Sequence, residues 1–143
     1  MIDARQYLRS FRVKESKLQL KLEQIQRLRD RLLSTSAPMD KEQVSHTTNV
    51  SVMADTIATI VDLQKEADVQ ASEFLKEKWK AMELMEQIRP ESSAVLIARY
   101  FEGKTYPEIG HEQFITERQA QRKEKTAIKE FQRVLARSEP TEA

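Results

Sequence analysis

The feature that most constrains the fold is a row of large apolar residues spaced seven apart near the N-terminus. This spacing places side chains along one side of an α-helix, as in a coiled coil. We therefore expect one long helix over residues 3–33. A helix cannot bury its own apolar stripe, so this one needs a second helix beside it. The row consists of Phe11, Leu18, Ile25 and Leu32, with Leu8 and Leu22 on the adjoining row.

A second stretch with helical spacing covers residues 51–88 and follows a segment without a stripe. That segment, residues 34–50, contains Pro38 and many Ser, Thr and Asn residues, so we predict a loop with His46 as a solvated loop histidine. Two long helices bury their stripes most simply as an antiparallel hairpin, which a second chain could double into a four-helix bundle. Alternatively, the methionines and aromatics of the second helix form a groove for a partner protein. Its apolar positions are Ile57, Ile60, Val61, Ala67, Ala71, Phe74, Leu75, Met82, Met85 and Ile88, with Trp79 beside them.

The composition agrees with an all-α fold. The 143 residues include only 2 Gly and 4 Pro, and 33% are charged against 39% apolar, which is typical of long helices. The chain has no Cys, and therefore no disulfide framework and no thiolate metal site. It contains no run of 18 apolar residues and no apolar signal region at its start. We expect a soluble cytoplasmic protein without a membrane partner.

A break at Arg89-Pro90 marks a predicted boundary between a hairpin domain, residues 1–88, and a C-terminal domain, residues 89–138. The residue before a proline is biased away from helical geometry, and proline itself suits the first turn of a helix. A helix is therefore expected from Pro90 to Phe101. Residues 139–143 are expected to form a disordered tail.

Two Thr-led segments follow, and each has the form of a capping box. Thr105 precedes Tyr106-Pro107-Glu108, and Thr116 precedes Glu117-Arg118-Gln119. In a capping box the Thr oxygen accepts one N–H of the first turn, and the acidic or amide side chain accepts another. Two helix starts eleven residues apart leave room for one short helix, ending near Gln113, and a tight turn. This is the spacing of a helix-turn-helix.

The final predicted helix, Glu117 to Arg137, separates its basic and apolar residues onto opposite faces. At about 100° per residue, Arg122, Lys125 and Lys129 fall within about 40° of Arg118. Over this helix and its caps, seven basic residues stand against three acidic ones, whereas the whole chain has a net charge of only +1. The rest of the chain is therefore slightly acidic. The opposite face carries Ala120, Ala127, Phe131 and Val134, with Ile128 and Leu135 at its edge.

This distribution predicts a recognition helix, residues 117–136, in the major groove of double-stranded DNA. The first residues of such a helix meet base edges, where Arg pairs with guanine and Gln with adenine, and later residues meet phosphates. The alternative without a binding function is a basic amphipathic helix whose charges only keep it soluble. The candidate DNA contacts are Arg118, Gln119, Gln121 and Arg122 for bases, Lys125, Lys129 and Lys104 for phosphates, and Thr116 at the start of the helix.

The stretch ARYFEGKTYPEIGHEQFITERQAQRKEKTAIKEF, residues 98–131, resembles region 4 of sigma factors. The whole chain is similar to small phage and prophage proteins of Gram-positive bacteria. These have a long N-terminal helix, a second helix with a stretch such as DTIATIVDLQKEAD (residues 55–68), and a C-terminus like sigma region 4. Relatives of the ArpU type are regarded as activators of phage late genes. The resemblance implies a transcriptional regulator in the cytoplasm of a bacterial host that binds promoter DNA. We expect such a regulator to be a homodimer through its long helices, or to be held on a partner by them, with RNA polymerase as a further candidate partner.

The sequence departs from this family pattern at the turn. A Leu-Gly-like or Met-Gly-like pair is usual there, whereas this chain has Gln113-Phe114. Glycine serves the positive φ that a tight turn needs, so Phe114 predicts a different and longer turn. Gly110 stands where the family usually has Ala. Glycine has the lower helix propensity, so it slightly weakens the short helix.

No catalytic constellation is visible, and we expect neither enzyme activity nor a cofactor. Glu108, His111 and Glu112 share one helical face, but one His with two carboxylates is a weak set of metal ligands. Two alternatives to a regulator remain, namely the DNA-recognition subunit of a phage packaging terminase and a helical adaptor that binds another protein. A dimer favours regulation and a ring of eight or more favours packaging, whereas an adaptor predicts no salt-dependent affinity for DNA.

Overall fold

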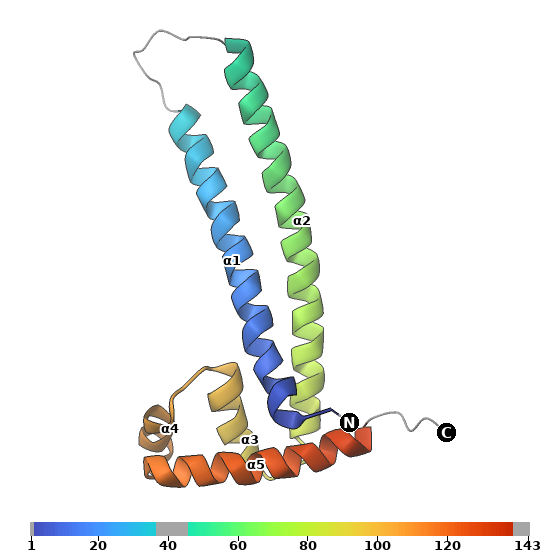
Figure 1. The fold of residues 1–143 in the computed structure, drawn as a ribbon, viewed down its shortest axis with the longest axis vertical. Helices are drawn as coiled ribbons and strands as arrows, with labels where there is room; N and C mark the ends of the chain where they lie inside the picture. The colour runs from blue at the N-terminus through green and yellow to red at the C-terminus, as the bar shows by residue number, and fades with distance from the viewer. Residues whose placement is uncertain (1, 37–45, 139–143) are drawn as a thin grey trace, which may run out of the picture. The chain divides into compact units, whose positions relative to one another are not determined.

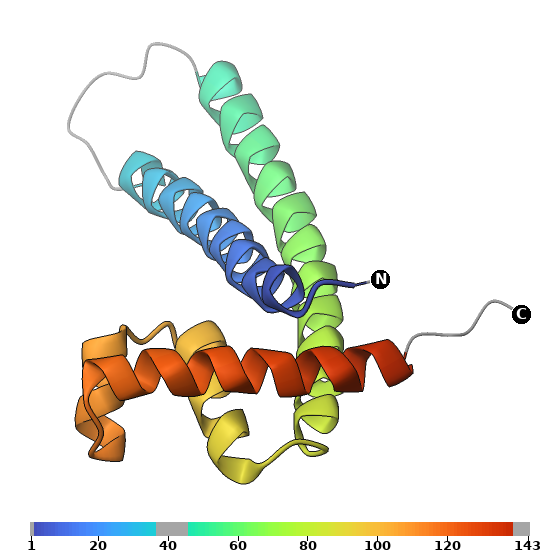
Figure 2. The same cartoon turned by 60° about the horizontal axis from the view of Figure 1, so that its bottom comes forward.

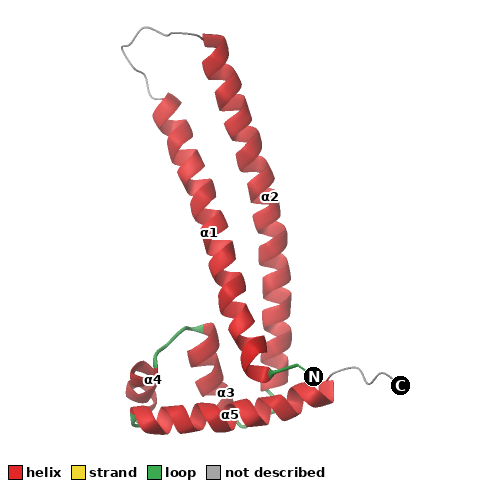
Figure 3. Cartoon of the chain, viewed as in Figure 1, coloured by secondary structure: helices red, strands yellow, loops and turns green. Residues whose placement is uncertain are grey.

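The computed structural model describes residues 2–36 and 46–138, and every regular element within them is a helix (Figures 1 and 3). The expected all-α class is therefore confirmed. No helix in this described part combines the length and the apolar character needed to cross a membrane. The predicted tail, residues 139–143, lies outside the described residues. In chain order the elements are α1 (Ala4–Ser36), α2 (His46–Met85), α3 (Pro90–Leu96), the π-helix η1 (Ile97–Phe101), α4 (Tyr106–Gln113) and α5 (Glu117–Ser138).

The loop predicted for residues 34–50 is wrong at both ends. Ser34–Ser36 continue α1, and α2 begins at His46, so His46 is helical rather than a loop residue. Residues 37–45 lie outside the described part of the chain. Ser, Thr and Asn each cost less than about 1 kcal/mol in a helix. Extending an existing helix over a few such residues is therefore easy, because the costly first turn has already formed.

The break at Arg89-Pro90 falls where the sequence predicts it, but α2 ends at Met85 rather than at the predicted Ile88. Arg89 has extended geometry, with φ −60° and ψ 141°, and Pro90 occupies the first turn of α3. The helix predicted to run from Pro90 to Phe101 instead changes to the π-helix η1 at Ile97. A π turn holds one residue more than an α turn, which alters the side of the helix on which each later residue lies.

The described chain divides into two compact units, and the division differs from the boundary predicted at residues 88 and 89. The larger unit contains the first fifteen residues together with everything from Phe74 onward, and the smaller unit spans Ser16–Glu73. The start of α1 and the end of α2 thus belong with the short C-terminal helices. The predicted boundary followed a local break in the helix pattern, whereas the units follow the packing of side chains.

In the smaller unit, α1 and α2 meet through one apolar row each. Ile25, Ile60 and Ala67 are buried there. At the edge of this contact, Lys21 Nζ lies 3.3 Å from Glu66 Oε2. Both ions are partly exposed, so this pair adds little stability. The half-buried residues packed against the cluster are Leu18, Leu28, Leu32 and Leu63.

Several residues predicted for the apolar stripes are exposed instead. On α2, Ile57 is 47% exposed and Val61 is 45% exposed, and Leu22 on α1 is 41% exposed. Leu75, Met82 and Trp79 are exposed as well. The prediction from periodicity treated two neighbouring rows of the second helix as one buried stripe. Only the row that includes Ile60 and Ala67 is buried.

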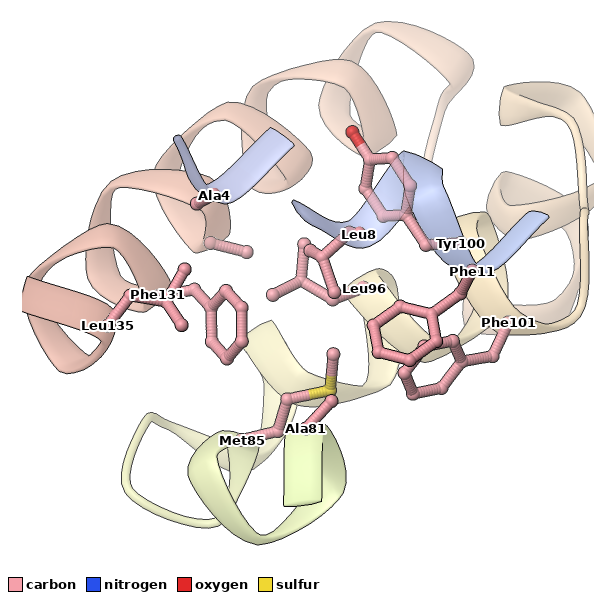
Figure 4. Close-up of a cluster of buried hydrophobic side chains, with 11 residues drawn as sticks. Ala4, Leu8, Phe11, Ala81, Met85, Leu96, Tyr100, Phe101, Phe131 and Leu135 are labelled. Carbon is pink, nitrogen blue, oxygen red and sulfur yellow. The ribbon is translucent and has the colours of Figure 1, made fainter. Parts of the chain in front are cut away.

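The core of the larger unit joins helices from both ends of the chain (Figure 4). Leu8 and Phe11 of α1 pack with Leu96 and with Phe131 of α5. Phe11 and Phe101 meet edge to face, with ring centroids 5.3 Å apart, which is a favourable aromatic geometry. The full buried cluster is Ala4, Leu8, Phe11, Ala81, Met85, Leu96, Tyr100, Phe101, Ala127, Phe131 and Leu135.

The start of α1 lies beside α5 within this unit (Figure 2), and hydrogen bonds join the two. The backbone N–H of Ala4 donates to Gln132 Oε1 at 2.7 Å, and Gln132 Nε2 donates to the carbonyl of Ile2 at 2.6 Å. One amide side chain therefore satisfies two backbone groups near the start of α1. Ile2 and Ala4 are therefore bonded directly to α5.

Candidate nucleic-acid interface

The start of α4 is capped by Thr105. Its Oγ1 accepts the backbone N–H of Glu108 at 3.3 Å, which satisfies one open donor of the first turn. The carboxylate of Glu108 accepts the hydroxyl of Thr105 at 3.0 Å. The sequence predicted a reciprocal bond to a backbone N–H, so only one half of that capping box is seen here.

The start of α5 carries the complete capping box. Thr116 Oγ1 accepts the N–H of Gln119 at 3.1 Å, and Gln119 Oε1 accepts the N–H of Thr116 at 2.9 Å. This box fixes the first turn of α5. It also engages the amide oxygen of Gln119, one of the predicted base contacts, while its NH₂ group keeps its donors.

The connection between α4 and α5 is a tight turn, so the longer turn predicted from Phe114 is wrong. Phe114 adopts left-handed geometry, with φ 57° and ψ 42°, and its N–H donates to the carbonyl of Gly110. This is the conformation that glycine usually supplies, and a non-glycine residue adopts it at a cost. The Phe114 side chain is 96% exposed, so no described contact compensates this cost.

Gly110 allows the turn to close on α4. A Cβ atom at this position would lie 2.7 Å from the backbone oxygen of Ile115, which is closer than real Cβ contacts. Glycine has a weak helix propensity, but its presence at this position therefore has a steric reason. The turn folds back over this residue, and the N–H of Ile115 donates to the Gly110 carbonyl at 2.9 Å.

The basic face of α5 is exposed and its apolar face is buried. Arg118, Arg122, Lys125 and Lys129 are all exposed. Gln121, which flanks them, is exposed as well. The buried apolar residues on the other side are Ala120, Ala127, Phe131, Val134 and Leu135.

Lys104 has a different environment from the lysines of α5. Its Nζ lies 2.5 Å from Glu102 Oε2 and 2.6 Å from Glu112 Oε1. These hydrogen bonds, first to Glu102 and then to Glu112, raise the pKa of Lys104 above its ordinary value. Two carboxylates thus surround the ammonium group, which makes Lys104 a poorer candidate for a phosphate contact than Lys125 or Lys129.

A buried carboxylate lies beneath the basic face, and the sequence reading missed it. Glu124 is 3% exposed. Its Oε1 accepts the hydroxyl of Tyr100, and its Oε2 lies 3.4 Å from Nη2 of Arg5. Burial, followed by the bond to Glu124, raises the pKa of Tyr100. The sequence contains a signal that could have revealed its burial. Glu124 lies four residues after Ala120 and three before Ala127, and therefore within the apolar stripe of α5.

Across the described residues, no three His, Asp or Glu side chains gather in a way that could hold a metal ion. Glu108 and Glu112, considered above as ligands with His111, bond instead to Thr105 and Lys104. The geometry of this surface is therefore that of charged and amide side chains on a rigid helix.

Comparison with known proteins identifies no relative of this chain. No protein-family model matches the chain, and no curated protein and no solved structure matches it.

Proposed function

We propose that the chain is a sequence-specific DNA-binding regulator of transcription, with α4 and α5 as the two helices of a helix-turn-helix. The observation that carries this proposal is the exposed basic face of α5, on a helix whose start is fixed by a capping box and a tight turn. A recognition helix needs both properties. Its side chains must reach base edges, and its backbone must hold them in one register.

The order of residues along α5 assigns their roles in this proposal. Arg118, Gln121 and Arg122 occupy the first turns, where side chains of a recognition helix meet base edges. Arg offers a bidentate pair to guanine, and Gln offers one to adenine. Lys125 and Lys129 follow one and two turns later on the same face, where they would contact phosphates.

The resemblance noted in the sequence supports a narrower proposal, namely control of late genes in a phage or prophage. Promoter DNA and RNA polymerase are then the expected partners. The terminase subunit and the adaptor remain the competing functions. Mass in solution separates the terminase from a regulator, and salt-dependent DNA affinity separates the adaptor from both.

Two substitutions test the DNA-binding proposal. Arg122→Ala should reduce the preference for the cognate promoter over an unrelated duplex by about 1–3 kcal/mol, because it removes a base contact. Lys129→Ala should weaken binding to both duplexes equally, because phosphates carry no sequence information. Fluorescence anisotropy at several salt concentrations measures both effects. Arg27→Ala, an exposed charge loss on α1 in the smaller unit, is the control and should change neither affinity. Unchanged binding in both α5 variants would contradict the proposal.

We further propose that the chain is a homodimer through an exposed row on α2. Val50, Ala54, Ile57 and Val61 are all exposed and have the four-three-four spacing of a coiled-coil seam. Between His46 and Gln64 only Asp55 and Asp62 carry a full charge, so this part of the helix is nearly uncharged all round. An apolar row on a helix normally faces a partner surface rather than water. The same row from a second copy, apolar and without opposing charges, would cover it.

A further inference from the structure

The basic face of α5 borders a hollow that also involves the start of α1. The hollow has a volume of about 360 Å³. From α5 it is lined by Arg118, Gln121, Arg122 and Lys125, whose spacing of three, four and seven residues places them on one side of the helix. The other lining residues are Arg5 from α1, Tyr106 from α4 and the buried Glu124.

The charges around this hollow favour an anion. Four cationic side chains line it, and Glu124 is the only acidic residue among the lining residues. The Glu124 carboxylate already accepts the hydroxyl of Tyr100 and lies beside Arg5. Arg118, Arg122 and Lys125 also line the hollow, and among the described residues they form no ion pair with a carboxylate. Gln121 adds amide donors between them.

Arg5 is only loosely held by Glu124. Their closest nitrogen and oxygen atoms are 3.4 Å apart, whereas a strong charge-assisted hydrogen bond measures about 2.7–2.9 Å. The side chain of Arg5 is 36% exposed, while that of Glu124 is 4% exposed. A guanidinium has five N–H donors, so Arg5 can keep this contact and still donate into the hollow.

The position of Arg5 is fixed by the backbone around it. The neighbouring Ala4 N–H and Ile2 carbonyl are both bonded to Gln132 of α5, and Leu8 is buried one turn later. The guanidinium is thus carried by a segment that is attached to the recognition helix itself. A charge held in this way loses little conformational freedom when it binds a ligand.

We propose that this hollow seats one backbone phosphate of the bound DNA duplex between Arg5 of α1 and Lys125 of α5, while Arg118, Gln121 and Arg122 extend past it to the base edges. Arg5 is then a phosphate contact supplied by α1. This inference rests on the proposed DNA-binding function and extends its surface from α5 to a helix at the other end of the sequence. Phosphate oxygens accept hydrogen bonds from Arg in the same planar fork geometry as carboxylates. The Arg5 contact adds affinity and fixes the register of α5 without reading sequence.

The salt dependence of binding tests the proposal directly. Each phosphate neutralised by a cation contributes about 0.9 to the slope of log affinity against log salt concentration on double-stranded DNA. Arg5→Gln should therefore reduce the slope by about one unit, equally for promoter and unrelated duplex. The matched control is Lys14→Gln, which also removes one cation that is paired with a carboxylate, Glu77, in the same unit. Lys14 lies nine residues further along α1, on its opposite side, so its loss should leave the slope unchanged.

A second pair of variants separates a DNA contact from a packing defect. Loss of Arg5 alone leaves the buried Glu124 without its ionic neighbour, which can disturb the fold. Glu124→Gln removes that charge, so Arg5→Gln in the Glu124→Gln background leaves no buried carboxylate behind. The double variant should again lose about one unit of slope relative to Glu124→Gln alone.

The outcomes distinguish this inference from the function beneath it. If the unaltered protein has no salt-dependent affinity for any duplex, the proposed function fails and the inference fails with it. If the unaltered protein binds DNA and both Arg5 variants keep the slope of their parents, the inference alone is overturned. A loss of slope in both backgrounds, with none in Lys14→Gln, supports it.

Discussion

Phe114 shows how one residue can oppose the local geometry that the fold demands. It holds a left-handed backbone conformation in a turn that glycine would enter without strain, and its exposed ring has no described packing to offset the cost. Phe114→Gly should therefore raise the free energy of unfolding by about 0.5–1 kcal/mol, after the added flexibility of the unfolded chain is counted. Urea denaturation measures the change. Phe114→Ala keeps a Cβ atom and should gain nothing, so equal stabilisation by both variants would disprove the strain.

The bond between Tyr100 and Glu124 is a second effect at the residue scale. Tyr100→Phe removes the hydroxyl that satisfies a buried carboxylate oxygen, and should lower the free energy of unfolding by about 1–3 kcal/mol at neutral pH. The pKa of Tyr100 is raised in the folded protein, so the folded state keeps this proton where the unfolded state releases it. Stability must then fall as pH rises above about 10, the ordinary pKa of tyrosine.

Urea denaturation between neutral pH and about pH 11 checks this sign. The stability difference between the unaltered protein and Tyr100→Phe should be largest at neutral pH and should narrow above about pH 10. Tyr106→Phe is the matched control, because the structure shows no hydrogen-bond partner for the Tyr106 hydroxyl in the described chain. A gap that stays constant with pH would mean that Tyr100 does not hold its proton more tightly when folded.

At the scale of elements, the link between α4 and α5 depends on a close approach rather than on helix propensity. Alanine is the better helix former by about 1 kcal/mol, yet a Cβ at Gly110 would press on the Ile115 backbone oxygen at 2.7 Å. Overpacking of this kind costs about 1–3 kcal/mol. Gly110→Ala should therefore lower the free energy of unfolding by about 1 kcal/mol in urea denaturation. His111→Ala, at an exposed position of the same helix, is the control and should change it by less than half as much.

The elements themselves were largely predictable because their signals are local. Thr105 and Thr116 cap α4 and α5 as predicted, and Pro90 begins α3. The π-helix was not predicted, because no pattern in its own segment marks it; its residues Tyr100 and Phe101 are buried in the core of the larger unit. The end of α1 and the start of α2 were predicted wrongly for a different reason. Ser, Thr and Asn are typical of loops, but here the two helices extend over these residues.

The candidate site was predictable only in part. Hydrophobic periodicity separated Arg118, Arg122, Lys125 and Lys129 from the buried face of α5, and all four are exposed. The place of Arg5 beside that face could not be read from the sequence, because it depends on contacts between residues more than a hundred positions apart. The pairing of Lys104 with two carboxylates is equally a result of folding.

At the scale of the whole molecule, the proposed dimer gives the prediction with the clearest readout. Ile57→Lys places a charge in the middle of the exposed row on α2, and desolvating an unpaired charge in an interface costs several kcal/mol. The mass by light scattering should fall from twice 16.7 kDa to the single-chain value. Thr59→Lys puts the same charge on another exposed side of the helix and should leave the dimer intact. A monomeric unaltered protein would contradict the proposal outright.

The larger unit is assembled from two ends of the polypeptide, and this has a consequence for its synthesis. Leu8 and Phe11 are synthesised before Phe131 and Leu135, which lie more than a hundred positions later in the sequence and complete the same core. Contacts of such long sequence separation close late in folding. The nascent chain therefore cannot complete the core of the larger unit until α5 has been synthesised.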